Sequence, residues 1–376
     1  MQVLEIAALI AGGFTLLRFA VSLPLVVRYF RRARVHTIPR GETPPMSVLV
    51  PLYGADPGLE QNLEGLLRQN YPDFEVLFLH EVPDDPALAA ARAAAERVPD
   101  VPVRYVQGRT DAVNPKVAVL ARGQQEARHD ILVSVDADVR PDALYLRDVA
   151  NGLMERDIVG FPPVLFGMQT AGARMLALFV NIEGFTALLV GRGLWIPGAT
   201  IGVRRAALQS IGGYQAVGDR MADDADLAAA LRRAGHPAVL SRRAARCYTP
   251  GGSLRETAVL MARWARTVRG AAPVLYAVGF LPAFAPLLLL ATALLSPHGV
   301  LALAAFALHN AMRIGLSVAI DLRFCWDRSM LRSLRMLPLM WFAEPLVWLA
   351  GLWGRTVVWR GRTYRLRGGR VSLAAP

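Results

Sequence analysis

Cysteine and histidine are scarce in this chain, and their placement excludes two common kinds of site. The 376-residue sequence has two cysteines, Cys247 and Cys325, which imply neither a disulfide framework nor a zinc knuckle. Its six histidines lie far apart without metal-ligand spacing, so we interpret them as surface or packing residues. Internal repeats and low-complexity linkers are also absent.

Charged residues are few as well, and this excludes an ordinary soluble protein. Only 19% of the residues are charged and 54% are hydrophobic, with a mean hydropathy of +0.33, so we expect a membrane component. The formal net charge is +12, from 42 Lys+Arg against 30 Asp+Glu. Because the arginines cluster beside apolar runs, the basic balance indicates anionic lipid at a cytoplasmic membrane surface rather than nucleic acid.

The N-terminal segment, residues 1–29, is predicted to be a transmembrane helix. The run Val3–Val27 is long enough to span a bilayer and contains two charged residues, Glu5 and Arg18. Positive charges follow this run rather than precede it, which disfavours a cleaved signal peptide and places this end in the cytoplasm. The arginines that follow it are Arg28, Arg31, Arg32, Arg34 and Arg40.

Residues 41–270 have the pattern of a cytoplasmic α/β domain with interfacial helices. Short apolar strands alternate with helices, which predicts a mostly parallel sheet covered on both faces. The expected strands are Ser47–Leu52, Phe74–His80, Val103–Val106 and Ile131–Val135. The expected helices are Leu59–Arg68, Ala87–Arg97, Lys116–Ala127 and Ala143–Glu155. We expect the apolar helix between Thr170 and Gly191 to lie near the membrane plane.

The C-terminal part is again apolar. Residues 271–321 are predicted to form a transmembrane hairpin, and residues 336–354 a re-entrant or interfacial segment with Glu344-Pro345 at its middle. A full crossing by this segment would put the arginine-rich tail, residues 355–376, outside the cell, against the positive-inside rule. We therefore expect the tail to be cytoplasmic.

The junction Asp136-Ala137-Asp138 follows the buried strand Ile131–Val135 directly. Two carboxylates at the carboxyl end of a parallel strand lie where open α/β sheets bind ligands. Their mutual repulsion calls for a cation, and hard oxygen ligands favour Mg²⁺ or Mn²⁺ together with a phosphate. A solvated turn is the alternative interpretation.

A second acidic pair, Asp223 and Asp224, precedes the helical pattern that begins at Leu227. Carboxylates at a helix start cap its first turn and oppose its dipole, which is one interpretation. The other is that one of them is a general base that takes a proton from an attacking hydroxyl.

Other residues carry weaker signals for binding. Arg263 and Trp264 belong to an amphipathic helix, Arg255–Arg269, which either anchors at the interface or closes over a diphosphate. Lys116 begins a helix, where it either faces solvent or contacts a phosphate. Pro51 and Tyr53 end the first strand, where a nucleotide base would lie, and Gly198 and Thr200 precede a strand at Ile201–Arg204 and could shape an acceptor pocket.

Taken in order, these motifs resemble the inverting, sugar-nucleotide-dependent glycosyltransferases of the GT-A fold, and more narrowly the ceramide glucosyltransferase family with its bacterial hopanoid-associated members. The resemblance covers the α/β domain and the flanking membrane topology. The matching motifs are Val50-Pro51-Leu52-Tyr53-Gly54-Ala55-Asp56, Asp84-Asp85-Pro86-Ala87, Asn114-Pro115-Lys116, Asp136-Ala137-Asp138, Asp223-Asp224 and Arg263-Trp264.

This resemblance implies a fold, a reaction and a set of roles. It implies a GT-A domain flanked by transmembrane helices in a bacterial inner membrane, and a sugar moved from a UDP-sugar to a hydroxyl of a membrane lipid. Asp224 would be the general base of a single displacement with inversion, and Asp136 and Asp138 would hold Mg²⁺ or Mn²⁺ on the diphosphate. The donor would contact Pro51, Tyr53, Glu81, Asp84, Lys116, Asp136, Arg263 and Trp264, and the acceptor Gly198, Thr200 and Asp223.

Two positions depart from the family pattern. Val82 stands where the family has a nucleotide-binding aspartate, which leaves Glu81, Asp84 or Asp85 for that role. The segment Leu260–Trp264 lacks the family's polar residue before Arg263-Trp264, which disfavours a processive polysaccharide synthase. A polysaccharide or polyprenyl-phosphate glycosyltransferase and an inactive membrane scaffold remain the alternatives.

Overall fold

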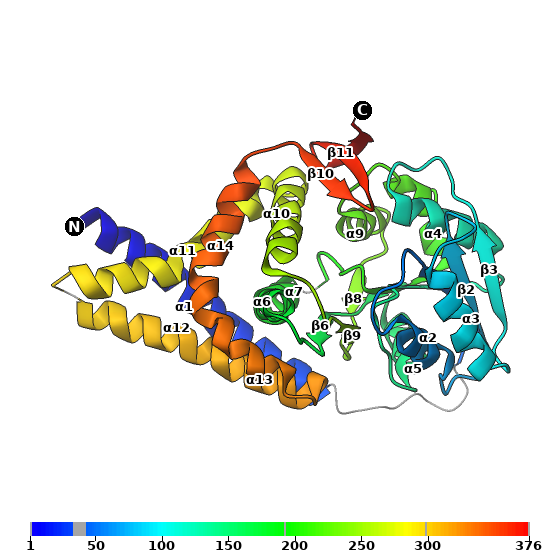
Figure 1. Ribbon diagram of the computed structural model, residues 1–376, viewed down its shortest axis with the longest axis horizontal. Coiled ribbons are helices and arrows are strands. Elements are labelled where there is room, and N and C mark those ends of the chain that lie inside the picture. The colour runs from blue at the N-terminus through cyan, green and yellow to red at the C-terminus, as the bar shows by residue number, and fades with distance from the viewer. Residues whose placement is uncertain (1, 33–42, 192, 298, 375–376) are drawn as a thin grey trace. The chain divides into compact units, whose positions relative to one another are not determined.

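The computed structural model describes residues 2–32, 43–191, 193–297 and 299–374, so Arg34, Arg40 and His298 lie outside the described residues. The chain forms two compact units (Figure 1). An α/β unit contains Tyr29–Leu165 and Gly191–Thr249, and a helical unit contains Met1–Arg28, Phe166–Val190 and Pro250–Pro376. The segment that we expected to be one domain, residues 41–270, thus contributes to both units.

The α/β unit is built on a seven-stranded sheet with the order β3-β2-β1-β4-β7-β5-β8. Neighbouring strands run parallel from β3 to β4 and between β5 and β8, while β7 is antiparallel to both β4 and β5. Every residue of β1, β2 and β4 is buried, as expected for parallel strands covered on both faces. The strands are β1 Met46–Pro51, β2 Phe74–His80, β3 Val103–Gln107, β4 Ile131–Val135, β5 Ile158–Gly160, β7 Thr200–Arg204 and β8 Ala238–Leu240. The mostly parallel sheet is confirmed.

The four predicted helices of this unit are confirmed within a few residues of their expected ends. The last of them begins at Tyr145 rather than Ala143, because the Asp142 carboxylate accepts the Leu144 N–H and forms a turn first. These helices are α2 Leu59–Leu67, α3 Ala87–Arg97, α4 Pro115–Glu126 and α5 Tyr145–Glu155. They are joined by α8 Arg205–Gln209, the 3₁₀ turn η2 Tyr214–Val217 and α9 Asp223–Arg233.

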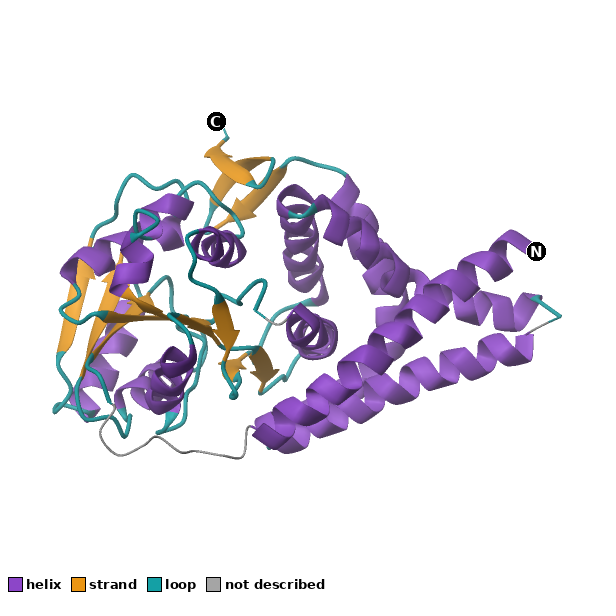
Figure 2. Cartoon of the chain, turned by 180° about the vertical axis from the view of Figure 1, so that it is seen from behind, coloured by secondary structure: helices purple, strands orange, loops and turns teal. Residues whose placement is uncertain are grey.

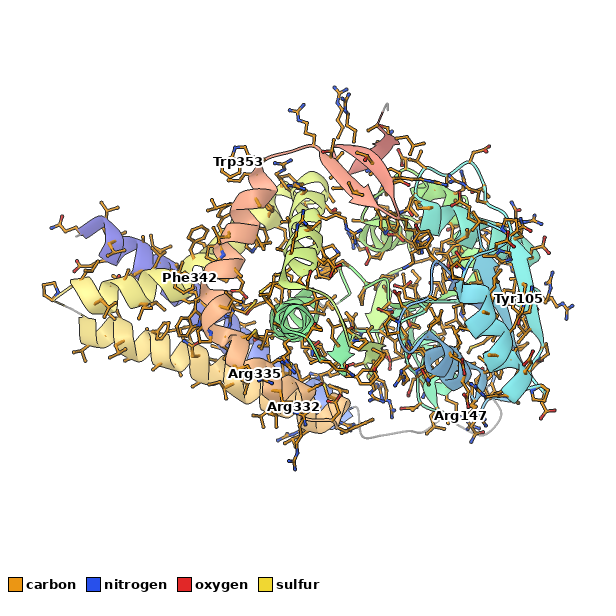
Figure 3. The ribbon with its side chains drawn as sticks, viewed as in Figure 1. Tyr105, Arg147, Arg332, Arg335, Phe342 and Trp353 are labelled. Carbon is orange, nitrogen blue, oxygen red and sulfur yellow. The ribbon has the colours of Figure 1, made fainter. Side chains whose placement is uncertain are left out.

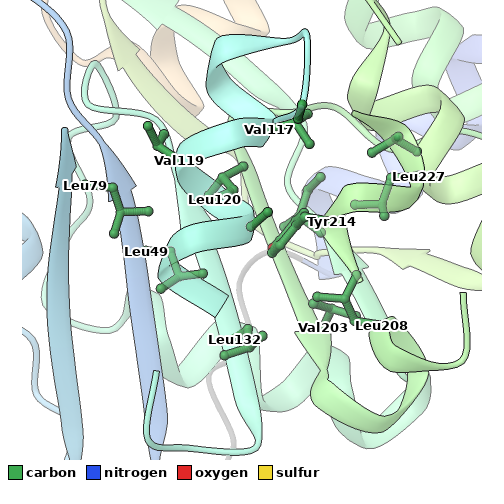
Figure 4. Close-up of a cluster of buried hydrophobic side chains, with 14 of the residues drawn as sticks. Leu49, Leu79, Val117, Val119, Leu120, Leu132, Val203, Leu208, Tyr214 and Leu227 are labelled. Atoms are coloured by element: carbon green, nitrogen blue, oxygen red, sulfur yellow. The ribbon is translucent and has the colours of Figure 1, made fainter. Parts of the chain in front are cut away.

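One hydrophobic cluster fixes α4 and α9 against the sheet (Figure 4). Leu49, Leu79 and Leu132 project from β1, β2 and β4 toward Leu120 of α4. Gly123 of α4 has no space for a side chain, because a Cβ there would lie 2.7 Å from the Leu79 side chain. The further members that Figure 4 labels are Val117, Val119, Val203, Leu208, Tyr214 and Leu227.

The strand order defines the functional edge of this sheet. The parallel connections run outward from β1 to β2 and β3, and then return to β4 on the other side of β1. The carboxyl ends of β1 and β4 are therefore neighbours at the point where the order reverses, the position where open α/β sheets bind ligands. A small two-stranded sheet of β6 Pro163–Phe166 and β9 Ala245–Tyr248 completes the unit.

The helical unit contains the apolar segments (Figures 1 and 2). Four stretches are long and apolar enough to cross a membrane: Gln2–Arg31, Ala171–Gly191, Pro273–Leu295 and Gly299–Cys325. Three of them match expected spans, while the second is the helix that we predicted to lie near the membrane plane. α14, Leu337–Leu352, has 16 residues, fewer than the roughly 20 of a straight span, so the re-entrant segment stays a prediction.

Several of these helices are interrupted. A π-helical segment, η1 Phe179–Gly184, separates α6 Ala171–Leu178 from α7 Phe185–Gly191. Another, η3 Asp321–Cys325, ends the long helix α12. The remaining helices of the unit are α1 Gln2–Arg32, α10 Leu254–Ala271, α11 Pro273–Leu295, α12 Gly299–Ile320, α13 Ser329–Ser333 and η4 Leu334–Met336.

The basic tail, to which the sequence analysis assigned no structure, is an antiparallel three-stranded sheet. Its strands are β10 Thr356–Trp359, β11 Arg362–Arg367 and β12 Arg370–Leu373. Two-residue turns join them, Arg360-Gly361 and Gly368-Gly369, and all four turn residues have positive φ. This is the geometry of type I′ turns, which glycine favours and which matches the twist of the strands.

A network of four charged side chains lies inside the helical unit. Arg313 of α12 is buried and bonds to Glu183 of η1 at 2.7 Å and to Glu344 of α14 at 2.8 Å. Arg18 of α1 contacts the same Glu183 at 2.5 Å. Two arginines thus neutralise two glutamates, which lowers the cost of charge among apolar helices. Arg18 therefore makes a polar contact within the unit.

We predict that Arg313→Met destabilises the protein strongly. The substitution leaves Glu183 and Glu344 without their shared cation, and removing one member of a buried pair typically costs about 3–5 kcal/mol. Thermal unfolding of the purified protein in detergent measures the effect. Arg335→Met, at an exposed position of the same unit, is the matched control and should melt like the wild type. Equal melting temperatures for the two variants would contradict a stabilising network.

Candidate active site

The loop after β4 holds Asp136, Ala137 and Asp138 through backbone contacts on both sides. The Asp136 N–H donates to the Ala199 carbonyl at 2.9 Å, and the Tyr248 N–H donates to the Asp138 carbonyl at 2.8 Å. The Asn62 side-chain amide of α2 donates to the Ala137 carbonyl at 3.1 Å. The peptide groups are thereby satisfied, and both carboxylates stay at the carboxyl end of β4.

Arg140 also supports the loop, through contacts with Asn62 and Tyr248. Its Nε donates to the Asn62 side-chain oxygen at 2.8 Å, and its guanidinium lies 4.1 Å from the centre of the Tyr248 ring. Gly58, at the start of α2, makes room for this stack, because it has a φ of +80° and a Cβ there would lie 2.5 Å from the Tyr248 ring. The geometry of the acidic loop therefore depends on residues from three separate segments.

The antiparallel strand β7 brings a second segment to the same place. Val135 pairs with Thr200, so the residues that precede β7 lie beside those that follow β4. Gly198 is in this segment, and its carbonyl accepts a hydrogen bond from the Lys116 ammonium at 3.2 Å. A Cβ on Gly198 would lie 3.2 Å from an Asp224 carboxylate oxygen and 3.4 Å from Lys116 Nζ. Glycine thus allows three groups to meet closely at this position.

Lys116 is positioned by the start of α4. The Asn114 side-chain oxygen accepts the N–H groups of Lys116 and Val117 at 2.9 and 3.1 Å, which caps the helix, and Pro115 occupies its first turn. The Asn114 amide also donates to the Arg220 carbonyl at 2.8 Å, which ties the loop before α9 to α4. Lys116 Nζ lies 2.5 Å from an Asp136 carboxylate oxygen.

Asp223 and Asp224 are the first residues of α9, and their negative charges interact with the Lys116 ammonium. Both are partly buried. Asp224 accepts the N–H of Ala225 at 2.8 Å, but the residue at the N-cap of the helix is Ala222, which has no side-chain cap, so the capping interpretation is not met by a cap hydrogen bond. Its other carboxylate oxygen is the one near Gly198. The two carboxylate oxygens of Asp224 therefore have different neighbours.

The pKa values of the cluster reflect burial and mutual charge. Burial, followed by the charge of Asp224, raises the pKa of the Asp223 carboxyl to about 7, although Lys116 opposes the shift. Burial also raises the pKa of Asp224. Burial alone would lower the pKa of Lys116, but the carboxylates of Asp136, Asp223 and Asp224 outweigh it and raise the pKa above its usual value. The lysine is therefore a permanent cation at neutral pH.

Asp136 and Asp138 fit a divalent cation. Desolvation of its carboxyl and the charge of the neighbouring Asp136 raise the pKa of Asp138, so another positive charge at this point would be stabilising. Within the described part of the chain, no basic side chain forms an ion pair with Asp138. Lys116 contacts one oxygen of Asp136. The donor set is therefore of the hard oxygen type that Mg²⁺ and Mn²⁺ prefer.

A second possible ligand cluster, in the helical unit, has a simpler explanation. Asp321, Cys325 and Asp327 offer ligand atoms that lie within 4.8 Å of one another. Asp321 accepts the N–H of Met330, and Asp327 accepts the N–H groups of Ser329 and Gly167. These carboxylates serve the connection between η3 and α13.

The residues predicted to bind the nucleotide are distributed around the end of β1. Pro51 is the buried last residue of β1, and Tyr53 follows it with half of its surface exposed. Glu81 bonds to Arg109 at 3.0 Å, and Asp84 is exposed. Asp85 was one of the candidates to replace the family's nucleotide-binding aspartate, whose position is occupied by Val82. It is buried and accepts the N–H groups of Gly54 and Ala87, so it joins the loop after β1 to α3.

Three other predicted residues have clear local surroundings. The Thr200 side chain is fully buried and accepts a hydrogen bond from Tyr145 at 2.8 Å, so any effect on an acceptor would come through positioning. Arg263 and Trp264 belong to α10, in the helical unit. Trp264 stacks on Phe179, and the Arg263 guanidinium lies 5.9 Å from the centre of the Trp359 ring in the tail sheet.

The sequence analysis missed the supporting residues Asn62, Arg140 and Tyr248, because their roles depend on contacts between distant segments. It also treated Lys116 as no more telling than a surface lysine. One signal in the sequence could have identified it: Lys116 is the only lysine, and all the other residues counted as Lys+Arg are arginines. A compact ammonium, rather than a planar guanidinium, fits among three carboxylates beside a glycine.

The chain matches a known family along almost its whole length. The model of glycosyl transferase family 21 matches residues 8–372. The protein is a glycosyltransferase, and the chain belongs to glycosyl transferase family 21. The predicted resemblance to ceramide glucosyltransferases and the predicted fold class, a GT-A-type α/β domain flanked by apolar helices, are thereby confirmed.

Individual relatives are similar at a lower level. Ceramide glucosyltransferase 1 of Caenorhabditis elegans is 24% identical over 350 residues, which cover 88% of this chain and 74% of the relative. A ceramide glucosyltransferase of Komagataella phaffii is 32% identical over 99 residues, or 25% of this chain and 19% of that one. Among solved structures, the mannosyltransferase PcManGT from Pyrobaculum calidifontis, in complex with GDP-Man and Mn²⁺, has a TM-score of 0.46 at 20% identity and covers 91% of this chain and 99% of its own.

We predict that Lys116→Met destabilises the folded protein in a pH-dependent way. At pH 7 it leaves the partly exposed carboxylates without their cation, at an expected cost of about 1–3 kcal/mol. As the pH falls below about 7, the Asp223 carboxyl becomes protonated because burial raises its pKa to about 7, and the difference from the wild type should shrink. Chemical unfolding in detergent across this pH range measures it. Lys116→Arg, which keeps the charge, should recover part of the loss, and a pH-independent difference would contradict the electrostatic role.

Proposed function

We propose that this protein transfers a sugar from a UDP-sugar to a hydroxyl group of a membrane lipid of ceramide or hopanoid type, with inversion at the anomeric carbon. The observation that carries the proposal is the meeting of Asp224, Lys116 and Asp136 around Gly198 at the functional edge of the sheet. The similarity to ceramide glucosyltransferases supports the lipid acceptor.

Asp224 is the proposed general base. The Asp224 carboxylate oxygen that does not accept the Ala225 N–H takes the proton of the acceptor hydroxyl. At the same time, the oxygen of that hydroxyl attacks the anomeric carbon of the sugar. The bond from the anomeric carbon to the diphosphate oxygen breaks on the opposite face, and its electron pair leaves with the UDP. A raised pKa makes Asp224 a stronger base than an exposed aspartate. Asp223, beside it, keeps a contact with the acceptor.

Lys116 and the acidic loop serve the leaving group. Lys116 holds Asp136 in place and supplies a positive charge at the diphosphate. Asp136 and Asp138 would hold a Mg²⁺ or Mn²⁺ ion, which offsets the negative charge that develops on the UDP. Pro51 and Tyr53 contact the nucleotide. Glu81 or Asp84 takes the role of the family's nucleotide-binding aspartate, whose position is occupied by Val82. The family resemblance further assigns Arg263 and Trp264 of α10 to the diphosphate.

We predict that Asp224→Asn abolishes transfer and leaves donor binding intact. An amide cannot take the proton, and loss of a general base typically costs roughly 10²- to 10⁴-fold in rate. Membranes containing each variant are incubated with a panel of UDP-sugars, and the lipid extract is analysed by mass spectrometry. Asp226→Asn, the same change in the same helical turn, is the control and should retain activity.

Each outcome of that experiment is informative. A glycolipid made by the wild type identifies the sugar and the acceptor together. Wild-type turnover by Asp224→Asn would remove the base assignment. A labelled polyprenyl phosphate or polysaccharide in place of a ceramide- or hopanoid-type product would overturn the acceptor class, and silence from the wild type would favour an inactive scaffold.

We also predict that donor binding requires a divalent cation held by Asp136. Titration calorimetry with UDP should show Mn²⁺-dependent binding that chelator removes and that Asp136→Ala weakens about tenfold or more. Asp130→Ala, at a fully exposed acidic position, is the matched control. Undiminished activity in excess chelator would exclude the metal, whereas loss of binding in both variants would point to a folding defect.

A further inference from the structure

Three arginines gather where α6 packs against α13 and η4, just before α14 begins. Arg332 of α13 and Arg335 of η4 are exposed and lie three residues apart, which makes them neighbours on a helical surface (Figure 3). Arg174 is in the first turn of α6, and the charges of Arg335 and Arg332 act on its guanidinium. We name these three residues the arginine cluster. All of them belong to the helical unit.

Hydrogen bonds from the loop before α6 hold this helix beside α13. The Gly167 N–H donates to the Asp327 carboxylate at 2.9 Å and to the Ser329 hydroxyl at 3.2 Å. Asp327 also accepts the Ser329 N–H at 2.9 Å, so its carboxylate serves the backbone of this connection. The fold therefore brings Arg174 close to Arg332 although their charges repel.

The arginine cluster has no counter-charge of its own. Within the residues that the structure describes, none of the three guanidinium groups forms an ion pair with a carboxylate. Arg335 Nε donates to the Arg332 carbonyl at 3.0 Å, which orients the side chain but does not offset its charge. Arg174 Nε is shielded from solvent and has no hydrogen-bond partner in the same described part of the chain. A buried N–H without an acceptor is costly, so the site suits an anion that accepts hydrogen bonds.

The position of the cluster in the chain places it at the end of an apolar helix. Residues 326–336 connect the candidate span that ends at Cys325 to α14, which begins at Leu337. The end of a membrane span lies among lipid headgroups, where tryptophan and arginine are both favoured. Trp326, in this connection, is 57% exposed, and Phe342 of α14 is 52% exposed (Figure 3). An occupant with an anionic and an apolar part therefore fits this surface.

We propose that the arginine cluster binds the phosphate of an anionic phospholipid. Guanidinium groups match phosphate oxygens in charge and geometry, and a phosphate held between Arg174 and the pair Arg332 and Arg335 would offset their mutual repulsion. Three positive charges disfavour the trimethylammonium group of phosphatidylcholine, so the lipid is of the phosphatidylglycerol type. Basic sites between helices at a membrane surface bind such headgroups. The proposal needs no sugar donor and is independent of the proposed reaction.

Native mass spectrometry of the full chain in detergent tests this site. The delipidated protein is titrated with phosphatidylglycerol or with phosphatidylcholine, and the fraction of lipid-bound protein is measured. We expect the apparent dissociation constant to be about tenfold or more lower for phosphatidylglycerol. Because the lipid would link α6 to α13, phosphatidylglycerol should also raise the melting temperature more than phosphatidylcholine does at the same concentration.

Two variants identify the groups responsible. The double variant Arg332→Gln, Arg335→Gln changes only exposed positions, and it should weaken phosphatidylglycerol binding about tenfold while leaving phosphatidylcholine binding unchanged. The control, Arg156→Gln, Arg233→Gln, removes the same charge from exposed positions of the α/β unit and should bind like the wild type. Equal melting temperatures of both variants without lipid show that the fold is intact.

Three results would overturn the proposal. The first is equal affinity of the wild type for the two lipids, and the second is wild-type affinity of the double variant for phosphatidylglycerol. The third is displacement of phosphatidylglycerol by inorganic phosphate or UDP at matched ionic strength, which would assign the arginine cluster to a soluble phosphate ligand.

Discussion

The contact between Lys116 and Asp136 is the interaction on which the candidate active site depends. Three carboxylates, those of Asp136, Asp223 and Asp224, converge there from two segments that are distant in sequence, and without a cation their repulsion would drive them apart. A lysine from a third segment supplies that cation at 2.5 Å. Burial makes the ammonium costly, but the surrounding negative charge outweighs the cost and raises its pKa. The same contact thus holds the fold at this edge and prepares it for an anionic ligand.

The sheet topology explains why these segments can meet. β1 and β4 are parallel neighbours, so their loops share one edge, and β7 runs antiparallel to β4, which returns the chain to the same edge. A parallel strand in the place of β7 would put Gly198 at the opposite edge, more than the length of a strand away. The antiparallel direction of β7 therefore places Gly198 beside Asp136 and allows α9 to present Asp224.

Local patterns made much of this predictable. The apolar runs of β1, β2 and β4, the cap at Asn114 and the acidic residues after β4 follow rules that act within a few residues. The partners were not predictable, because the bond from Lys116 to the Gly198 carbonyl and the stack of Arg140 on Tyr248 join positions 82 and 108 residues apart. The tail sheet was missed for a different reason. Its short strands are rich in arginine, so we interpreted the segment by its charge alone. The turn signals Arg360-Gly361 and Gly368-Gly369 were therefore not used to predict strands.

The helical unit contains both buried and exposed arginines, and their surroundings differ because only the exposed ones are in contact with water. Where no water is available, Arg18 and Arg313 are matched one to one by Glu183 and Glu344, because an unpaired charge among apolar helices costs several kcal/mol. On the tail sheet, residues 355–374 carry six arginines and no acidic residue, and most of these arginines are exposed to water, which screens their charge.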